Sequence, residues 1–157
     1  MLEWLIELKP LKHKNMYLLF KEFHSYIAFL LLVVLVVVIA MGIYGWVAKK
    51  PFTKTTRLLA LVGLGAAQSQ FTIGLVLYFL SPLGLSNFSG EAMKNSVSRL
   101  YVMEHPLMMI LAIVLVTVGY IKTKKATKDS LKYKNMVIFY SIELAFILSR
   151  IPWEMWL

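Results

Sequence analysis

The hydrophobic residues of the chain are gathered into four long blocks that alternate with charged segments. The blocks cover about residues 24–46, 58–80, 106–121 and 136–153, and the first contains the run LLLVVLVVVIAMGIYGW. A helix needs roughly 20 apolar residues to cross a hydrocarbon core of about 30 Å, and only a helix satisfies its own backbone there. The pattern predicts an all-α integral membrane protein, an up-and-down bundle of four transmembrane helices.

The segments outside these blocks predict two short elements at the membrane surface. Residues 1–23 form a charged N-terminal tail, and residues 24–157 form the transmembrane domain. Apolar residues near the start of the tail share one face of a short interfacial helix that Pro10 is expected to end. Ser89 and Glu91 are typical of a helix N-terminus, which predicts a short interfacial helix before the third span.

The basic residues predict the orientation in the membrane. The formal charge is +9, and ten of the 17 Lys and Arg lie in two loops, four in residues 49–57 and six in residues 122–134. Basic loops tend to stay on the cytoplasmic side. We therefore expect a multi-pass protein of the bacterial inner (cytoplasmic) membrane, with these loops cytoplasmic and both termini periplasmic. Nucleic acid is not expected as a partner, because the charge lies between spans and no nucleic-acid motif accompanies it.

The residue types available limit the chemistry. The chain has no cysteine, which excludes disulfides, iron–sulfur clusters and thiolate catalysis. The hydrolase signatures GxSxG and HExxH are also absent. An electron carrier or an accessory subunit therefore fits the chain better than a stand-alone enzyme, although the sequence leaves enzymatic activity open.

The second block has the spacing of a close-packed membrane helix. Its segment GLGAAQSQFTIG contains three pairs four residues apart: Gly63 and Ala67, Gly65 and Ser69, Gln70 and Gly74. Small residues at this spacing let helix backbones approach closely in lipid. Gln68 and Gln70 stand two residues apart and point about 200° away from each other on a helix, so at most one can face the centre of the bundle.

Polar side chains within or beside the blocks are candidates for function, because polar groups are costly in hydrocarbon. They are His24, Gln68, Gln70, His105, Glu143 and Arg150. His24 and His105 begin the first and third spans, which run in the same direction and are diagonal neighbours in an up-and-down bundle. The two imidazoles could therefore supply both axial ligands of a haem b, with Arg150 paired to a propionate. Alternatively, each histidine is an interfacial cap whose ring reaches toward water.

Other interpretations of these residues remain open. Met103, His105, Met108 and Met109 offer thioether and imidazole ligands suited to Cu(I), although methionine is also a routine packing residue. Glu143 could relay protons, or it could hydrogen-bond Gln68 or Gln70 and fix the register of the helices. Arg150 could form an interfacial ion pair with Glu154, one helical turn away.

Several segments together resemble a known family. They are HS at 24–25, KPFT at 50–53, IGLVLYF at 73–79, SP at 81–82, EHPLMM at 104–109, GY at 119–120 and SRIPW at 149–153. Over about residues 16–153 the chain resembles the small four-helix membrane proteins of Bacteroidota known as cytochrome B or cytochrome-b-like. The resemblance implies a haem b with His24 and His105 as ligands. Gln68 is a departure, since relatives often carry a histidine there.

Three functions follow as predictions. The first is a haem-b electron-transfer protein that exchanges electrons with a quinol or a membrane redox partner, with quinone as a further cofactor. His24 and His105 would hold iron, Arg150 would neutralise a propionate, and Gln68 and Glu143 would support the ligands or relay protons. The second is a non-catalytic accessory subunit of a larger respiratory or envelope membrane complex. The third is a copper- or small-solute-handling protein. In each case the lipid bilayer is the first partner.

Overall fold

The chain is helical throughout the part that the structure describes. The computed structural model describes residues 2–156, and side chains are described for residues 14–154 and 156. No strand occurs within residues 2–156, which confirms the predicted all-α class. The long helices are α1 (Leu2–Val47), α2 (Lys54–Leu80), α5 (His105–Lys125) and α6 (Asp129–Ser149). Shorter helices are η1 (Leu85–Asn87), α3 (Gly90–Lys94), α4 (Ser96–Arg99), the π-helical η2 (Leu100–Glu104) and α7 (Trp153–Trp156).

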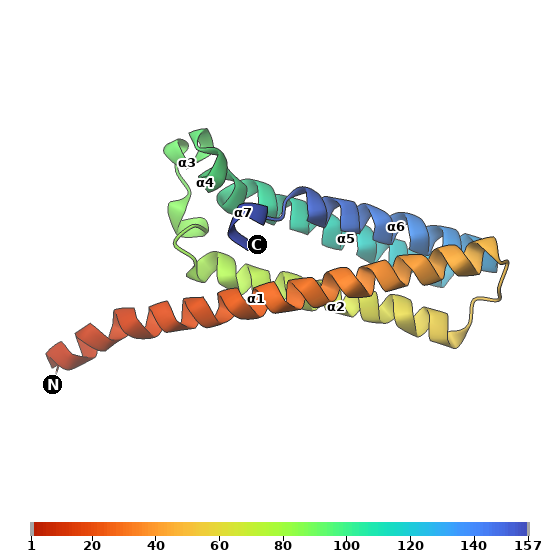
Figure 1. The fold of residues 1–157 in the computed structure, drawn as a ribbon, viewed down its shortest axis with the longest axis horizontal. Coiled ribbons are helices and arrows are strands. Elements are labelled where there is room, and N and C mark those ends of the chain that lie inside the picture. Colours follow the sequence, from red (N-terminus) through yellow and green to blue (C-terminus); the bar gives the residue numbers. More distant parts are fainter. Residues whose placement is uncertain (1, 157) are drawn as a thin grey trace.

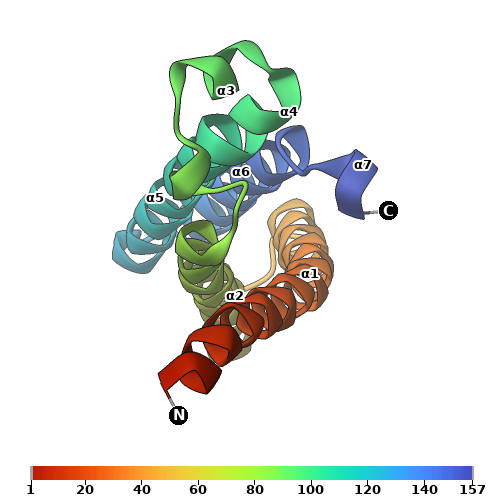
Figure 2. The ribbon, with the colours of Figure 1, turned by 90° about the vertical axis from the view of Figure 1, so that its left-hand side faces the viewer.

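The four long helices lie side by side, and consecutive ones run in opposite directions (Figure 1). Helix α1 packs against α2 and α6, and α5 also packs against α2 and α6. Helices α1 and α5 therefore occupy opposite corners of the group, as the near end-on view in Figure 2 shows. This arrangement sets residues of α1 and α5 across from each other.

Three helical stretches of the described chain are long and apolar enough to cross a membrane: Lys14–Val47, Lys54–Leu80 and Ser96–Lys125. The fourth predicted span, residues 136–153, is not among them. It falls within α6 and the segment after it, where Ser141 and Glu143 interrupt the apolar pattern and the helix ends at Ser149.

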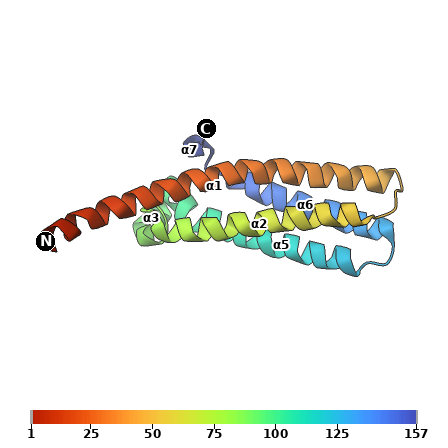
Figure 3. The ribbon, with the colours of Figure 1, turned by 90° about the horizontal axis from the view of Figure 1, so that it is seen from below.

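The N-terminal part of the chain differs from the prediction. Pro10 does not end a separate helix, because α1 runs without interruption from Leu2 to Val47. A proline inside a helix removes one backbone hydrogen bond, but the neighbouring turns keep theirs. His24 consequently lies in the middle of α1 rather than at its start. The first part of α1 projects beyond the other helices (Figure 3).

A buried tyrosine joins α6 to α2. Tyr140 is fully buried, and its hydroxyl donates a hydrogen bond to the backbone carbonyl of Ala60 on α2. A Cβ atom on Gly63 would lie 2.9 Å from the Cε1 atom of Tyr140, so the ring fits only beside a glycine. Gly63 and Ala67 therefore pack inside, as predicted, whereas Ser69, of the next pair, is exposed.

The segment between α2 and α5 is fastened at several points. The Oγ atom of Ser89 accepts a hydrogen bond from the backbone N–H of Ala92 at 3.1 Å, which confirms the predicted helix start. The Tyr78 hydroxyl donates to the Val102 carbonyl at 2.9 Å and ties the π-helical turn η2 to α2. This turn leads directly into His105 at the start of α5.

Candidate functional site

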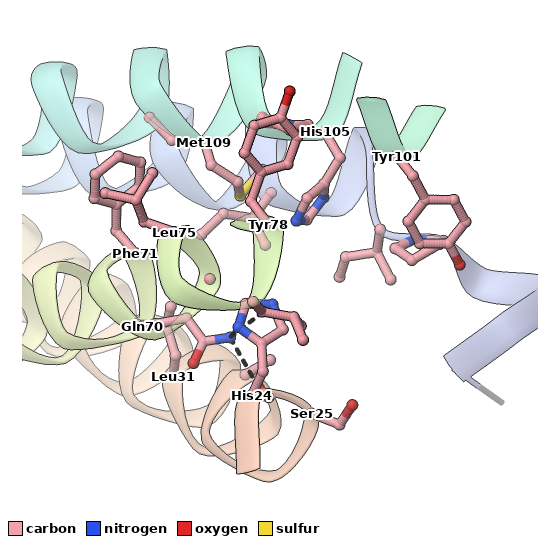
Figure 4. Close-up of a pocket in the computed structure, with 18 of the residues that line it drawn as sticks. His24, Ser25, Leu31, Gln70, Phe71, Leu75, Tyr78, Tyr101, His105 and Met109 are labelled. Atoms are coloured by element: carbon pink, nitrogen blue, oxygen red, sulfur yellow. Dashed lines mark hydrogen bonds between the residues drawn. The ribbon is translucent and has the colours of Figure 1, made fainter. Parts of the chain in front are cut away.

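A cavity of about 380 Å³ lies between the four long helices at the end that carries α7. Its walls are mostly apolar, and side chains from every long helix contribute to them. Polar side chains in the lining include Tyr17, Lys21, His24, Ser25, Gln70, Tyr78, Tyr101, His105 and Glu143. Figure 4 shows the histidines and Gln70 within this lining. A mostly apolar pocket with a few convergent polar groups is the usual form of a ligand or cofactor site.

The structure brings His24 and His105 together across the cavity. Their ring centroids are 6.4 Å apart, and the ring planes are inclined by 79°. His24 comes from α1 and His105 from α5, the two helices at opposite corners. Both side chains line the same cavity, and Figure 4 shows the imidazoles on opposite sides of it.

One hydrogen bond fixes the protonation of the His105 ring. The Nδ1 atom lies 2.8 Å from the backbone carbonyl oxygen of Arg150. Arg150 follows the last residue of α6, where carbonyl groups have no partner within the helix. Because a carbonyl can only accept, Nδ1 must carry the proton, and Nε2 of the neutral ring keeps its lone pair. A histidine held in this way has one nitrogen free to act as a ligand.

The ring of His24 is held by α2. The Nε2 atom of Gln70 donates to the His24 backbone carbonyl at 2.9 Å and lies 3.1 Å from Nδ1 and 3.3 Å from Nε2 of the imidazole. Gly74, one turn along α2, makes room for the same ring: a Cβ atom there would lie 2.9 Å from Cε1 of His24. Sequence reasoning missed this role of Gln70 and Gly74, although their four-residue spacing places them on one face of the helix.

Gln68 does not reach the site. It is exposed and faces away from the other helices. Gln70 is 8% exposed and lines the cavity. The two glutamines therefore point in opposite directions, as expected for residues two apart on a helix, and the predicted supporting role of Gln68 is wrong.

Glu143 also lines the cavity, but it does not make the predicted hydrogen bond to a glutamine. Its side chain is 1% exposed, and its Oε2 atom has no hydrogen-bond partner among the described residues. The Oε1 atom of Gln70 is likewise buried without a partner. Two buried acceptor atoms without a donor in one cavity wall are unusual, because such groups are normally paired with protein, water or a ligand.

The charged groups beside His105 form a short chain. The Nε atom of Arg99 lies 2.7 Å from Oε1 of Glu104, and the Nε atom of Arg150 lies 3.4 Å from Oε2 of the same carboxylate. The structure thus pairs Arg150 with Glu104 and not with Glu154. The side chain of Arg150 is 42% exposed, so its guanidinium can still reach a second anion.

The methionines proposed as copper ligands are not gathered at one point. Met109 lines the cavity near His105, whereas Met103 is 41% exposed and lies outside the lining. Within the described part of the chain, no group of three or more His, Asp or Glu side chains could hold a metal ion. The histidine pair is therefore the main set of nitrogen ligands in the cavity.

Comparisons with known proteins do not identify the chain. No family model, curated protein or solved structure matches it. The resemblance to cytochrome-b-like proteins stays a prediction.

Proposed function

We propose that the chain is a membrane electron carrier that holds a haem b between His24 and His105. The observation that carries this proposal is the separation of 6.4 Å between the two ring centroids. If the two imidazoles lay on opposite sides of one metal ion, bonds of about 2 Å would set their ring centres roughly 6 Å apart. Two imidazoles that line one mostly apolar cavity are a donor set that would hold a haem b.

The surroundings of the two imidazoles support the same assignment. His105 keeps the lone pair on Nε2 because its Nδ1 proton is bonded to the Arg150 carbonyl. For His24, the supporting group is the Gln70 side-chain amide, whose Nε2 atom donates to the His24 backbone carbonyl at 2.9 Å and lies 3.1 Å from Nδ1 of the ring. Hydrogen bonds of this kind orient histidine ligands and increase their basicity.

The rest of the cavity suits a large, mostly apolar group. Its lining is mostly apolar. The partly exposed guanidinium of Arg150, the residue before the lining residue Ile151, would be available to pair with a carboxylate. Held there, a haem b supplies a one-electron couple whose potential depends on its axial ligands and their hydrogen bonds. The role of the chain would be to hold the two imidazoles in place and to offer the Arg150 guanidinium to a carboxylate.

The proposal includes insertion into the bacterial inner membrane, with α6 as a fourth span. Outward-facing apolar side chains support lipid contact: Phe29, Val36 and Val114 are 65%, 55% and 52% exposed. Exposed apolar side chains that form a large patch mark a surface that contacts a membrane or another protein. In the proposed orientation, loops 49–57 and 122–134 are cytoplasmic and both termini periplasmic. A quinol or a membrane redox protein would supply the electron.

A second candidate function is an accessory subunit without a cofactor. It is favoured by the fact that both imidazoles already have protein partners, Gln70 for His24 and the Arg150 carbonyl for His105. In that case the histidines would join α1 to α2 and α5 to α6. The unpartnered atoms of Gln70 and Glu143 are not explained by this alternative.

The haem content of the purified protein separates the two functions. The protein is expressed in cells supplied with haem precursor, purified in mild detergent and assayed by the pyridine haemochrome method. A ratio near one haem per chain supports the electron carrier. Protein that is folded and monodisperse but free of haem supports the accessory subunit.

A further inference from the structure

The outward face of α2 carries polar and small residues at the depth where a membrane helix is normally most apolar. This α2 outer face consists of Gly65, Gln68, Ser69, Thr72, Val76 and Phe79, all of them exposed. Their spacing of three and four residues places them on one side of the helix, opposite Gln70 and Gly74. The face has no partner among the described elements.

Gln68 lies at the centre of this face. It stands 14 residues from the start of α2 at Lys54 and 12 residues from its end at Leu80. At 1.5 Å per residue, its amide is about 20 Å from either end of the helix. In the proposed membrane orientation, the amide has no access to water at either surface. An amide that faces lipid at this depth has no hydrogen-bond partner for its N–H groups or for its carbonyl oxygen, which is costly.

The small residues beside Gln68 serve no packing within the chain. A Cβ atom on Gly65 would have nothing within 4 Å, whereas one on Gly63, on the inner face, would meet Tyr140. The Thr72 hydroxyl donates to the backbone carbonyl of Gln68 at 2.9 Å, so this hydroxyl already has a partner within the helix. Gly65 and Ser69, four residues apart, therefore leave an open groove in which another helix backbone can approach closely.

We propose that this face is the contact through which two copies of the chain associate in the membrane, with Gln68 of each copy bonded to Gln68 of the other. Two copies inserted with the same orientation carry Gln68 at the same depth. A glutamine amide has both a donor and an acceptor, so two identical amides across a two-fold axis satisfy each other. A different helix would need its own polar group at that depth to match. The inference rests on the proposed membrane insertion, but not on the proposed haem.

Cross-linking in native membranes tests the contact, and the absence of cysteine from the chain makes single-cysteine variants clean probes. Thr72→Cys places a thiol on the α2 outer face. Val36→Cys on α1 and Val114→Cys on α5 are controls on other helices, because both residues lie within apolar blocks and are more than half exposed. We expect oxidation to give a disulfide-linked pair of chains from Thr72→Cys and none from the controls. Equal cross-linking at all three positions, or none at Thr72→Cys, overturns the inference.

A second pair of variants tests the role of the amide. In the Thr72→Cys background, Gln68→Leu should weaken dimerisation by roughly ten-fold, whereas Gln68→Asn keeps an amide and should lose less. Undiminished dimerisation with Gln68→Leu contradicts the proposed amide pair. A cross-link from Thr72→Cys to a different protein, in place of a second copy, overturns the choice of partner.

The same membranes distinguish failure of this inference from failure of the proposed function. Carbonate extraction reports membrane insertion, and the haem spectrum reports the cofactor. Extraction of the chain into the soluble fraction overturns both the membrane assignment and the dimer contact. A carbonate-resistant chain that has haem but no Thr72→Cys cross-link overturns the dimer contact alone, and a cross-linked chain without haem overturns the electron carrier alone.

Discussion

The Nδ1–H group of His105 donates a hydrogen bond to the backbone carbonyl of Arg150 at 2.8 Å, which joins the first residue of α5 to the end of α6. The side chain of Arg150 is in turn held by Glu104, the residue before His105. One residue after α6 therefore contacts two consecutive residues at the start of α5. This double contact explains how a short helix junction can hold an imidazole in a defined orientation.

Gln70 should matter for haem affinity, whereas Gln68 should not. Gln70→Leu removes the amide beside His24, and loss of such a supporting hydrogen bond typically lowers metal affinity 10–100-fold. We expect haemin titration of the apoprotein to show a loss of about ten-fold or more. Gln68→Leu, on the opposite face of the same helix, is the matched control and should bind haemin normally. Equal effects of the two substitutions contradict the site.

Gly74 should be sensitive to a single methyl group. Gly74→Ala would place a Cβ atom 2.9 Å from Cε1 of His24, so the imidazole must shift away from α2. We expect lower haem occupancy and a broadened low-spin spectrum. The control is Gly65→Ala, where the added methyl group has nothing within 4 Å. Full occupancy in Gly74→Ala would show that the ring does not need its present position.

Tyr140 should contribute to stability through its hydroxyl. Tyr140→Phe keeps the ring but removes the buried hydrogen bond to the Ala60 carbonyl, which should cost about 1 kcal/mol. Thermal unfolding in detergent measures the change. Tyr26→Phe, at a residue 76% exposed, should leave the midpoint of unfolding unchanged. A midpoint for Tyr140→Phe that equals the wild-type value would contradict the importance of this contact.

The buried carboxyl group of Glu143 should lower the free energy of unfolding of the protein. Its carboxyl group is buried with an unpartnered oxygen, which costs roughly 1–3 kcal/mol relative to an apolar side chain of similar volume. We expect Glu143→Leu to raise the midpoint of thermal unfolding, and Glu143→Gln to change it little. A marked destabilisation by Glu143→Leu would mean that the carboxyl group has a structural partner.

Much of the fold follows from the sequence because hydrophobic blocks and helix period are local properties. The blocks predicted the long helices, and the matched positions of His24 and His105 in blocks of the same direction predicted that they would meet. The prediction placed His24 at a helix end, however, because block edges were equated with helix ends. In fact α1 continues through Pro10 and the charged tail.

The missed features depend on tertiary contacts. Helical period showed that only one of Gln68 and Gln70 could face inward, but not which one, since both stand among small residues. The partner of Arg150 is Glu104 and not Glu154, because the helix ends before residue 150 and the chain turns there. The carboxyl of Glu143 was expected to find an amide, yet its Oε2 atom has no hydrogen-bond partner among the described residues. None of these outcomes can be read from spacing along a single helix.

The reduced-minus-oxidised visible spectrum of histidine variants tests the central claim most directly. The protein is purified in mild detergent as wild type, His24→Ala and His105→Ala, with His13→Ala as the control, since His13 is the remaining histidine of the chain. The account predicts a sharp low-spin haem b spectrum in the wild type and in His13→Ala, and its loss in both other variants. A low-spin spectrum that survives either His24→Ala or His105→Ala would contradict ligation by this pair.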